Sequence, residues 1–298
     1  MKVFINYKII SSPHGGGNSF LSALIKWFDK NNFLAPSFLD ADIVLFNSHH
    51  QVEKLYEMKK LKPSLKFANR LDGPQTWKTK DVDEKVFFYN NQFANGTIFQ
   101  SHYSLNSTIA EGFKFVYPFT IIPNAVDKDI FYPPTNKQQN NKIRIIASSW
   151  SDNWSKGFKY YQFLDTNLDF NKYEMFFVGR SPTTFKNIKH IQALPSVELG
   201  NFLRTGDCYI SAPENDPASN ALGEALACGL PSAYLHSGGH PEIVKEAGEG
   251  FKNETECLSA IGKISGAIKY YSSLIDIPTM DEIGNKYIEF FKKINNET

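Results

Sequence analysis

The stretch NDPASNALGEALACGLP (residues 215–231) joins a polar turn to an apolar run, directly after the strand-like CYISAP. Three apolar residues of this run repeat with helical period: Leu222, Ala225 and Leu226. Gly229 and Pro231 then form the glycine-and-proline ending that stops a helix. We therefore predict a strand, a loop at the carboxyl edge of a sheet, and a helix that begins near Ser219 or Asn220.

Two carboxylates accompany this helix start, Asp216 before it and Glu224 inside the apolar run, one turn after Asn220. The eight positions between them span roughly 12 Å at helical rise, comparable to the reach between two sugars across a diphosphate. Helix N–H groups can cradle a phosphate, and carboxylates accept paired hydrogen bonds from vicinal hydroxyls. The alternative is that Asp216 and Ser219 are turn and cap residues and that Glu224 lies on a solvated face.

The composition is that of an ordinary folded chain, and nothing in it favours a nucleic-acid partner. The 298 residues favour two domains, with 42% hydrophobic residues, 21% charged residues and a net charge of +1. The chain has three cysteines, Cys208, Cys228 and Cys257, and none of them forms a CxxC pair. This odd, scattered set of cysteines predicts a reducing cytoplasmic location. The N-terminus is too short and too polar for a signal peptide, and no apolar run is long enough to span a bilayer.

Short apolar runs alternate with longer helical patterns in both halves of the chain. This rhythm predicts an α/β protein with parallel sheets covered by helices, which bind ligands at the carboxyl ends of their strands. The polar stretch YPPTNKQQNNK (residues 132–142) predicts a linker. We therefore place the first domain at residues 1–134 and the second at residues 135–279.

The last segment, TMDEIGNKYIEFFKKI, predicts an amphipathic helix. Thr279 and Glu282 have the spacing of a capping box at its start. Its apolar residues fall on one face and are Ile283, Tyr287, Phe290, Phe291 and Ile294.

The longer segment NDPASNALGEALACGLPSAYLHSGGHPEIV resembles the signature of glycosyltransferase family 4, a large retaining group with the GT-B fold. That signature has two spaced acidic residues, then Ala-x-Ala-x-Gly-x-Pro and Gly-Gly-x-x-Glu-Ile. Asp216 here replaces the usual first glutamate. The residues that match are Glu224, Gly229, Pro231, Gly238, Gly239, Glu242 and Ile243.

The resemblance implies two Rossmann-like domains that face each other across a cleft, with the helix of residues 280–298 crossing back to the first domain. It implies transfer of a sugar from a nucleotide-diphosphate sugar to a glycan or lipid-linked acceptor, with retention and without a metal or other cofactor. Glu224 would grip the ribose, and Asp216 would contact the donor sugar. The backbone near the diphosphate would be that of residues 218–221, which include Ser219, Asn220 and Ala221.

SSWSDNWSKGF (residues 148–158) resembles the family's strand-to-loop segment that carries a Lys-Gly pair. The resemblance implies that Lys156 neutralises the leaving diphosphate. The family usually has an arginine shortly before this lysine, where this chain has serines. We include Ser149 among the substrate-binding residues and name Arg180 as a substitute cation. By itself, however, a Lys-Gly pair is a common helix start.

PHGGGNSFL follows the first predicted strand, where the family has a Gly-Gly loop near the donor phosphate and the acceptor. Gly15, Gly16 and Gly17 are therefore substrate-binding candidates, although a flexible turn explains them equally. In RLDGP, Asp72 falls where the family often has an acidic residue or histidine close to the reacting carbon, and an ordinary Asp-Gly turn is the alternative. IIPNAVDKDIF (residues 121–131) resembles the segment that ends the family's first domain.

Other functions stay open. Asp40-Ala41-Asp42 matches the metal-binding Asp-x-Asp of the GT-A fold, but it precedes a strand, so a helix-to-strand connection is expected. His49-His50 has no third ligand at a suitable spacing, which favours a polar loop role. A non-catalytic sugar-binding protein and a nucleotide-sugar epimerase of the same fold are the alternatives to a transferase.

A lysine-rich stretch near aromatic residues could contact anionic lipid at the inner membrane surface. A solvated helix face explains it more simply. Its members are Lys54, Lys59, Lys60, Lys62 and Lys66.

Overall fold

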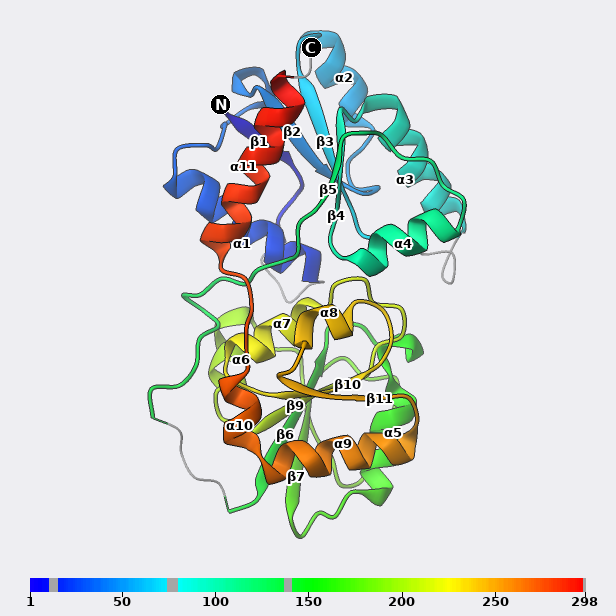
Figure 1. The fold of residues 1–298 in the computed structure, drawn as a ribbon, viewed down its shortest axis with the longest axis vertical. Helices are drawn as coiled ribbons and strands as arrows, with labels where there is room; N and C mark the ends of the chain where they lie inside the picture. Colours follow the sequence, from blue (N-terminus) through cyan, green and yellow to red (C-terminus); the bar gives the residue numbers. More distant parts are fainter. Residues whose placement is uncertain (11–15, 74–79, 137–140, 297–298) are drawn as a thin grey trace. The chain divides into compact units, whose positions relative to one another are not determined.

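The computed structural model describes residues 1–10, 16–73, 80–136 and 141–296. The chain forms two compact units, each built on its own sheet of parallel strands (Figure 1). The first unit comprises residues 1–9, 21–124 and 278–298, and the second comprises residues 10–20 and 125–277. Every strand pair in both sheets is parallel, as the alternating pattern predicts.

The strands of the first unit follow one another across its sheet in the order β1-β2-β3-β4-β5. Its elements are β1 (Val3–Asn6), α1 (Gly16–Lys30), η1 (Phe38–Asp40), β2 (Ile43–Asn47), α2 (Lys54–Leu61), β3 (Lys66–Leu71), α3 (Lys80–Phe93), β4 (Gly96–Phe99), α4 (His102–Ala110), β5 (Phe119–Ile121) and α11 (Met280–Asn296). Residues 16–20 of α1 group with the second unit.

Helices cover both faces of this first sheet, which explains why all residues of the apolar strand β2 are buried. Helices α2 and α3 pack on one face, where Leu55 and Met58 share a core with Phe67. Helix α11 packs on the opposite face, and Ile294 lies against Gly96 of β4 (Figure 1). The apolar side of α11 is buried as predicted.

The predicted capping box begins α11. The backbone N–H of Thr279 donates to Glu282 Oε2 at 2.7 Å, and the backbone N–H of Glu282 donates to Thr279 Oγ1 at 3.2 Å. Both bonds satisfy N–H groups that a helix start leaves open. The local sequence therefore defines where the last helix begins.

The second unit has the strand order β11-β10-β9-β6-β7-β8. Its elements are β6 (Ile143–Ser149), η2 (Trp154–Lys156), α5 (Phe158–Asn167), β7 (Tyr173–Gly179), β8 (Lys189–Ile191), α6 (Ser196–Leu203), β9 (Cys208–Ser211), α7 (Asn220–Ala227), β10 (Ser232–Leu235), α8 (His240–Val244), β11 (Gly248–Phe251), α9 (Glu254–Gly266) and α10 (Ile268–Ser273).

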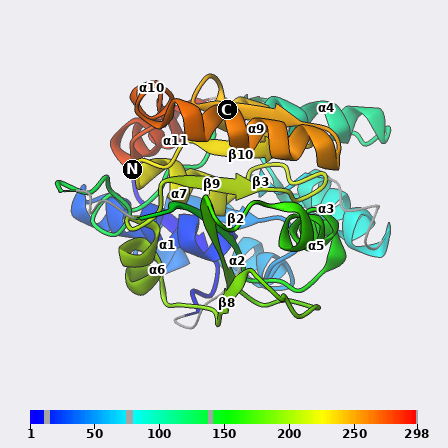
Figure 2. The ribbon, with the colours of Figure 1, turned by 90° about the horizontal axis from the view of Figure 1, so that it is seen from below.

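Helices sandwich the second sheet as well. Helices α5 and α9 supply one core, in which Phe158 and Ile261 pack with Phe177 of β7. Helices α6, α7 and α8 supply the other, with Leu203 and Leu222 among its buried residues. Figure 2 shows this unit from below, with α9 running along one side of β9 and β10.

The long segment of the second unit begins earlier than the linker pattern predicts, at Ala125 rather than at residue 135. Phe131 is 3% exposed and belongs to the core beneath α7. The carbonyl of Ile130 accepts a hydrogen bond from Arg204 Nη1 at 2.8 Å. The segment that ends with Phe131 therefore packs with the second sheet. The polar stretch that predicts a linker begins only after this segment, at Tyr132.

Candidate active site

The second sheet reverses its winding between β6 and β9. From β6 the chain adds β7 and β8 on one side, and it then adds β9, β10 and β11 on the other side. In open α/β sheets, ligands bind at such a switch point, outside the carboxyl ends of the strands. The loops that leave β6 and β9 here carry Lys156 and Asp216.

An ion pair joins these two loops. Lys156 Nζ lies 3.1 Å from Asp216 Oδ2, and both side chains remain about one-fifth exposed, at 20% and 17%. Burial raises the pKa of Asp216, but the Lys156 ammonium and then His240 outweigh it and hold the pKa below its usual range. The sequence names both residues of the pair, and the structure places them together.

His240 is the first residue of α8 and interacts electrostatically with Asp216. It is fully buried, its Nδ1 lies 2.9 Å from the carbonyl oxygen of Leu235, and its Nε2 lies 3.3 Å from Ser211 Oγ. A carbonyl only accepts, so Nδ1 carries the proton. Burial lowers the pKa of His240, while the Asp216 carboxylate opposes that effect. The position directly after the Gly-Gly pair is the signal that could have found it.

The Gly-Gly pair holds the backbone of Asp216. Gly239 N–H donates to the carbonyl oxygen of Asp216 at 2.9 Å. Gly238 has a φ of +63°, and a Cβ at this position would overlap that same carbonyl. Only glycine meets both demands without strain, so this part of the family resemblance has a structural reason.

Helix α7 begins at Asn220 and gives way to the left-handed Gly229, as predicted. Glu224 lies on its buried side with 7% exposure, and Ser19 Oγ donates to its Oε1 at 3.0 Å. Burial raises the pKa of Glu224 to about 7, and the Ser19 bond opposes the rise. The alternative prediction, that Glu224 lies on a solvated face, is therefore wrong.

The start of α1 lies close to the start of α7. A Cβ on Gly16, the first residue of α1, would lie 2.5 Å from Asn220 Nδ2. The two helix starts thus approach each other closely within the second unit, and both present N–H groups that favour an anion. Gly17 makes no such close approach, and Gly15 lies outside the described residues.

The remaining residues predicted around the helix start differ in exposure. Ser219 is 6% exposed at the N-cap of α7, where its side chain caps no N–H group of the helix. Asn220 Nδ2 lies 3.5 Å from the carbonyl oxygen of Ala218. Ala221 is half-buried in the first turn. This turn offers its backbone rather than a side-chain cap, which suits a bound phosphate.

Ser149 and Arg180 meet through their backbones at the ends of β6 and β7. Arg180 N–H donates to the carbonyl oxygen of Ser149 at 2.9 Å. The Ser149 hydroxyl donates to the carbonyl oxygen of Ser151 at 2.8 Å. The Arg180 side chain is exposed, and no contact within the described part of the chain joins its guanidinium to Lys156. The structure therefore places Arg180 at the correct edge of the sheet but not in the ion pair.

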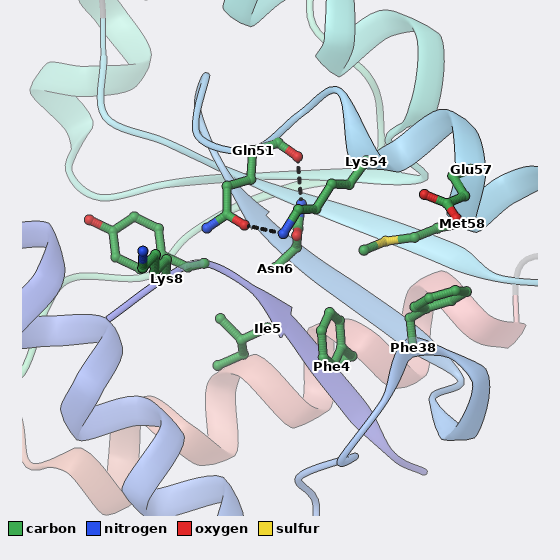
Figure 3. A pocket seen from close by; sticks show the side chains of 10 residues that line it. Phe4, Ile5, Asn6, Lys8, Phe38, Gln51, Lys54, Glu57 and Met58 are labelled. Carbon is green, nitrogen blue, oxygen red and sulfur yellow. Dashed lines mark hydrogen bonds between the residues drawn. The ribbon is translucent and has the colours of Figure 1, made fainter. Parts of the chain in front are cut away.

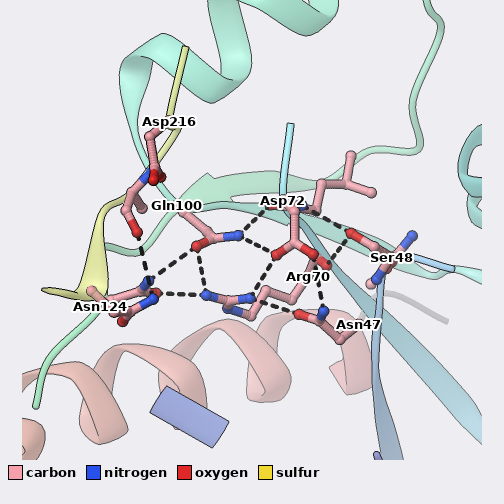
Figure 4. Close-up of polar contacts among 11 residues, drawn as sticks. Asn47, Ser48, Arg70, Asp72, Gln100, Asn124 and Asp216 are labelled. Atoms are coloured by element: carbon pink, nitrogen blue, oxygen red, sulfur yellow. Dashed lines mark hydrogen bonds and ion pairs between the residues drawn. The ribbon is translucent and has the colours of Figure 1, made fainter. Parts of the chain in front are cut away.

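The first unit has its own polar cluster at the carboxyl edge of its sheet, centred on the fully buried Arg70 (Figure 4). Arg70 Nη1 donates to Asn47 Oδ1 at 2.6 Å and to Asp72 Oδ1 at 3.0 Å. Its Nη2 donates to Gln100 Oε1 at 2.6 Å and to Asn124 Oδ1 at 2.7 Å. One guanidinium thus ties together residues at or just beyond the carboxyl ends of β2, β3, β4 and β5.

Asp72 is the member of this cluster that the sequence named. Its side chain is 25% exposed, whereas that of Arg70 is 0% exposed. Gln100 Nε2 donates to Asp72 Oδ1 at 2.6 Å, and Asn47 Nδ2 donates to Asp72 Oδ2 at 3.2 Å. An Asp-Gly turn alone does not require so many donors, so the structure favours a held, accessible carboxylate. Arg70 lies within RLDGP, the segment quoted above. A charged residue inside a predicted buried strand needs polar partners, and this signal could have revealed the cluster.

The other charged motifs have structural partners. Asp40 ends η1 just before β2, as a helix-to-strand connection, and Asp42 Oδ2 accepts from the N–H of Lys2 at 2.7 Å. His49 and His50 stack on each other after β2, with ring centroids 4.3 Å apart. Within the described residues, no three His, Cys, Asp or Glu side chains are grouped so as to hold a metal ion.

The lysines near α2 bond largely within the protein. Lys62 Nζ donates to the carbonyl oxygens of Leu39 at 2.9 Å and Ala41 at 2.6 Å. Lys59 Nζ donates to the carbonyl oxygen of Leu65 at 3.1 Å. None of the helices in the described ranges is long and apolar enough to cross a bilayer.

Comparison with solved structures shows strong likeness over nearly the whole chain. Sucrose-phosphate synthase from Thermosynechococcus elongatus matches 95% of this chain and 79% of its own, with a TM-score of 0.69 and 11% identity. Anabaena HepE, solved in complex with UDP-glucose, matches 98% of this chain and 100% of its own, with a TM-score of 0.71 and 13% identity. A glycosyltransferase from Rickettsia africae ESF-5 matches 98% of this chain and 85% of its own, with a TM-score of 0.62 and 17% identity.

The two parallel sheets and these likenesses define the GT-B fold, which confirms the predicted fold class. The sequence itself matches no family model and no curated protein. The structural neighbours therefore establish the architecture, and the chemistry rests on the residues described above.

Proposed function

We propose that this chain is a retaining, metal-independent glycosyltransferase that moves a sugar from a nucleotide-diphosphate sugar to an acceptor hydroxyl. The observation that carries the proposal is the Lys156–Asp216 ion pair at the switch point of the second sheet. A cation there can bind the diphosphate that leaves during transfer. The likeness to HepE, which was solved with UDP-glucose, and to the glycosyltransferase from Rickettsia africae supports this assignment.

Each residue near the start of α7 has a role in this proposal. The backbone N–H groups of residues 219–221, with those that open α1 at Gly16, hold the diphosphate. Glu224 accepts hydrogen bonds from the ribose hydroxyls after it loses its proton, and Ser19 orients it. Asp216 contacts the donor sugar and holds Lys156 in place.

The chemical step follows from these positions. The bond between the sugar carbon and the leaving phosphate oxygen breaks as the acceptor oxygen bonds to the same face of that carbon. The acceptor's proton passes to the leaving phosphate, and Lys156 with the helix N–H groups stabilises the charge that develops there. On the first unit, Asp72 is the residue for which the family resemblance implies a role close to the reacting carbon.

Thermal unfolding with a panel of donors tests the proposal. UDP-glucose, ADP-glucose and GDP-mannose are each added with EDTA, and the melting temperature is recorded. A true donor at 100 times its Kd stabilises the native state by about 2.7 kcal/mol. Glu224→Ala should abolish this shift. If no donor raises the melting temperature, or if the shift requires a divalent metal, the proposal is wrong.

One observation favours a non-catalytic sugar-nucleotide-binding protein as the second candidate. Ser149 stands near the position where the resembled family carries an arginine, and its hydroxyl is bonded to its own loop. A binding protein would show the thermal shift without hydrolysing the donor, whereas an epimerase would convert it to an isomeric nucleotide sugar. Chromatography of the donor after incubation with the purified chain separates these three outcomes.

Membership of glycosyltransferase family 4, a role in glycan, polysaccharide or glycolipid synthesis, and a cytoplasmic location at the inner membrane surface stay predictions. Lys54 and Lys60 of α2 have exposed side chains that could contact anionic lipid. Flotation with phosphatidylglycerol vesicles tests that contact. If the chain does not float with these vesicles, the predicted contact with anionic lipid is wrong.

A further inference from the structure

A pocket of about 460 Å³ lies beside the first strand of the first unit (Figure 3). Strand β1 and the two residues after it line one part of the pocket, and Phe38 of η1 lines another. The rest of the lining comes from Gln51, which precedes α2, and from the first turns of α2. This volume falls within the range of small-molecule sites. The pocket belongs to the first unit alone, so its ligand binds without help from the donor-binding residues.

One wall of the pocket is apolar. The rings of Phe4 and Phe38 pack edge to face, with centroids 6.4 Å apart, and both side chains remain partly exposed. Met58 closes this wall from α2 with 4% exposure. Such a surface suits the C–H face of a sugar ring better than a fully hydrated ion, because burial of apolar surface supplies part of the affinity.

The opposite side offers mainly hydrogen-bond donors. Lys8 and Lys54 bring ammonium groups, whereas Glu57 is the one carboxylate among the residues that line the pocket. Lys54 Nζ donates to Gln51 Oε1 at 2.7 Å, which fixes its position and leaves two of its three N–H groups for a ligand. Two ammonium groups against one carboxylate favour a ligand that carries a negative charge.

The loop after β2 connects the pocket to Asp72. Ser48 and Gln51 both have left-handed backbones, with φ of +49° and +52°. Ser48 Oγ accepts the backbone N–H of Asp72 at 2.9 Å, and the backbone oxygen of Gln51 accepts from Asn6 Nδ2 at 3.0 Å at the pocket. Strained residues of this kind persist where the surrounding structure demands them, often at binding sites.

Tyr7 is the pocket residue that feels the charge of Asp72. It lines the pocket and packs edge to face on His50 at 5.2 Å. Burial raises the pKa of Tyr7, the Asp72 carboxylate raises it further, and Arg70 opposes both. The charges of Asp72 and Arg70 therefore act on a residue that lines the pocket.

We propose that this pocket binds the acceptor, and that the acceptor is a sugar bearing an anionic group, either a carboxylate or a phosphate. The ring lies on Phe4 and Phe38, the anion pairs with Lys54 and Lys8, and a hydroxyl faces Asp72. This assignment rests on the proposed glycosyl transfer, because only a transferase needs an acceptor beside Asp72.

Ligand-observed NMR titration of the full chain tests the pocket without any donor present. The probes are glucose, glucuronic acid and glucose 6-phosphate, so that the two acids distinguish a carboxylate from a phosphate. We expect at least one acid to bind about tenfold more tightly than glucose, since a hydrogen bond to a charged group contributes about 1.5–3 kcal/mol. Lys54→Met should remove this advantage. Lys30→Met, which changes an exposed lysine at the end of α1 outside the pocket, should leave it unchanged.

Three results would overturn the inference: no binding of either acid, equal binding of glucose and both acids, or the same loss in both lysine variants. The outcome is separable from that of the proposed function. If the acids fail but UDP-glucose stabilises the chain, the acceptor assignment is wrong and glycosyl transfer survives. If the acids bind but no donor does, the pocket stands as an acidic-sugar site and the transferase proposal falls.

Discussion

Lys156 and Asp216, which are 60 residues apart in the chain, meet at 3.1 Å where the second sheet reverses its winding. The pair holds a cation next to the helix start that the sequence predicts as a phosphate site. Because Lys156 offsets the charge of Asp216, this carboxylate would not repel the proposed diphosphate ligand.

Loss of Lys156 should reduce turnover far more than folding. We expect Lys156→Ala to lower kcat for donor hydrolysis or transfer by about 100-fold to 1,000-fold, the range for removal of one preorganised charge at a transition state. Lys159→Ala is the matched control, because that lysine is 53% exposed and lies 3.9 Å from Glu214. Steady-state rates decide the matter, and equal activity of both variants would remove Lys156 from the site.

Glu224 should make the stability of the ligand-free protein depend on pH. Its pKa is raised from 4.5 to about 7, so folding favours the protonated form. This contribution is fully present below about pH 4.5 and is lost as the pH rises through about 7. Glu224→Gln should therefore match the parent near pH 4.5 and exceed its free energy of unfolding by up to roughly 3 kcal/mol at pH 8.

Denaturant unfolding at several pH values measures this difference. The exposed Glu246→Gln serves as the control and should show no such trend. The parent's affinity for a nucleotide sugar should fall as the pH drops below about 7, because the ribose needs the ionised carboxylate. A flat stability difference between pH 5 and pH 8 would contradict the burial argument.

Removal of the Arg70 guanidinium should destabilise the first unit. Arg70→Met leaves the amides of Asn47, Gln100 and Asn124 without their shared donor. We expect a loss of about 3–5 kcal/mol, as for a buried charge whose partner is removed. Arg180→Met changes an exposed arginine and should cost less than about 0.5 kcal/mol. Unfolding curves for the two variants that coincide would show that the cluster does not hold the strand ends together.

Gly238→Ala should disturb the site through the backbone of Asp216. The added methyl would overlap the Asp216 carbonyl, and the left-handed φ adds strain of about 1–3 kcal/mol. Gly262→Ala, inside α9 and with nothing near its Cβ position, should instead stabilise the chain by about 0.5–1 kcal/mol. Melting temperatures that move in the same direction for both variants would argue against the contact.

Local periodicity was enough to predict most of the elements that position the site. The extent of α7 follows from its helical repeat and from Gly229, and the start of α11 follows from Thr279 and Glu282. These signals act over a few residues, so they can be read without knowledge of the fold. The alternation of short apolar runs with longer helical patterns was likewise enough to predict parallel sheets.

Long-range contacts account for what the sequence did not reveal. Ser19 reaches Glu224 across 205 positions, and Gln100 and Asn124 reach Arg70 across 30 and 54. No spacing rule connects such residues, because the sheet rather than the helix repeat brings them together. The boundary of the second unit differs from the predicted one for the same reason, since Phe131 packs in a core formed by residues between Ile146 and Ala247.

The place of α11 has a practical consequence for dissecting the molecule. Trp27 Nε1 donates to Asp281 Oδ1 at 2.7 Å, and Phe28 and Phe291 pack with centroids 6.3 Å apart, so the first unit borrows its closing helix from the far end of the chain. A clone that stops at Asn124 would leave this apolar face bare and invite aggregation. Expression of the first unit by itself therefore calls for a fusion that joins Asn124 to Pro278 through a short artificial linker.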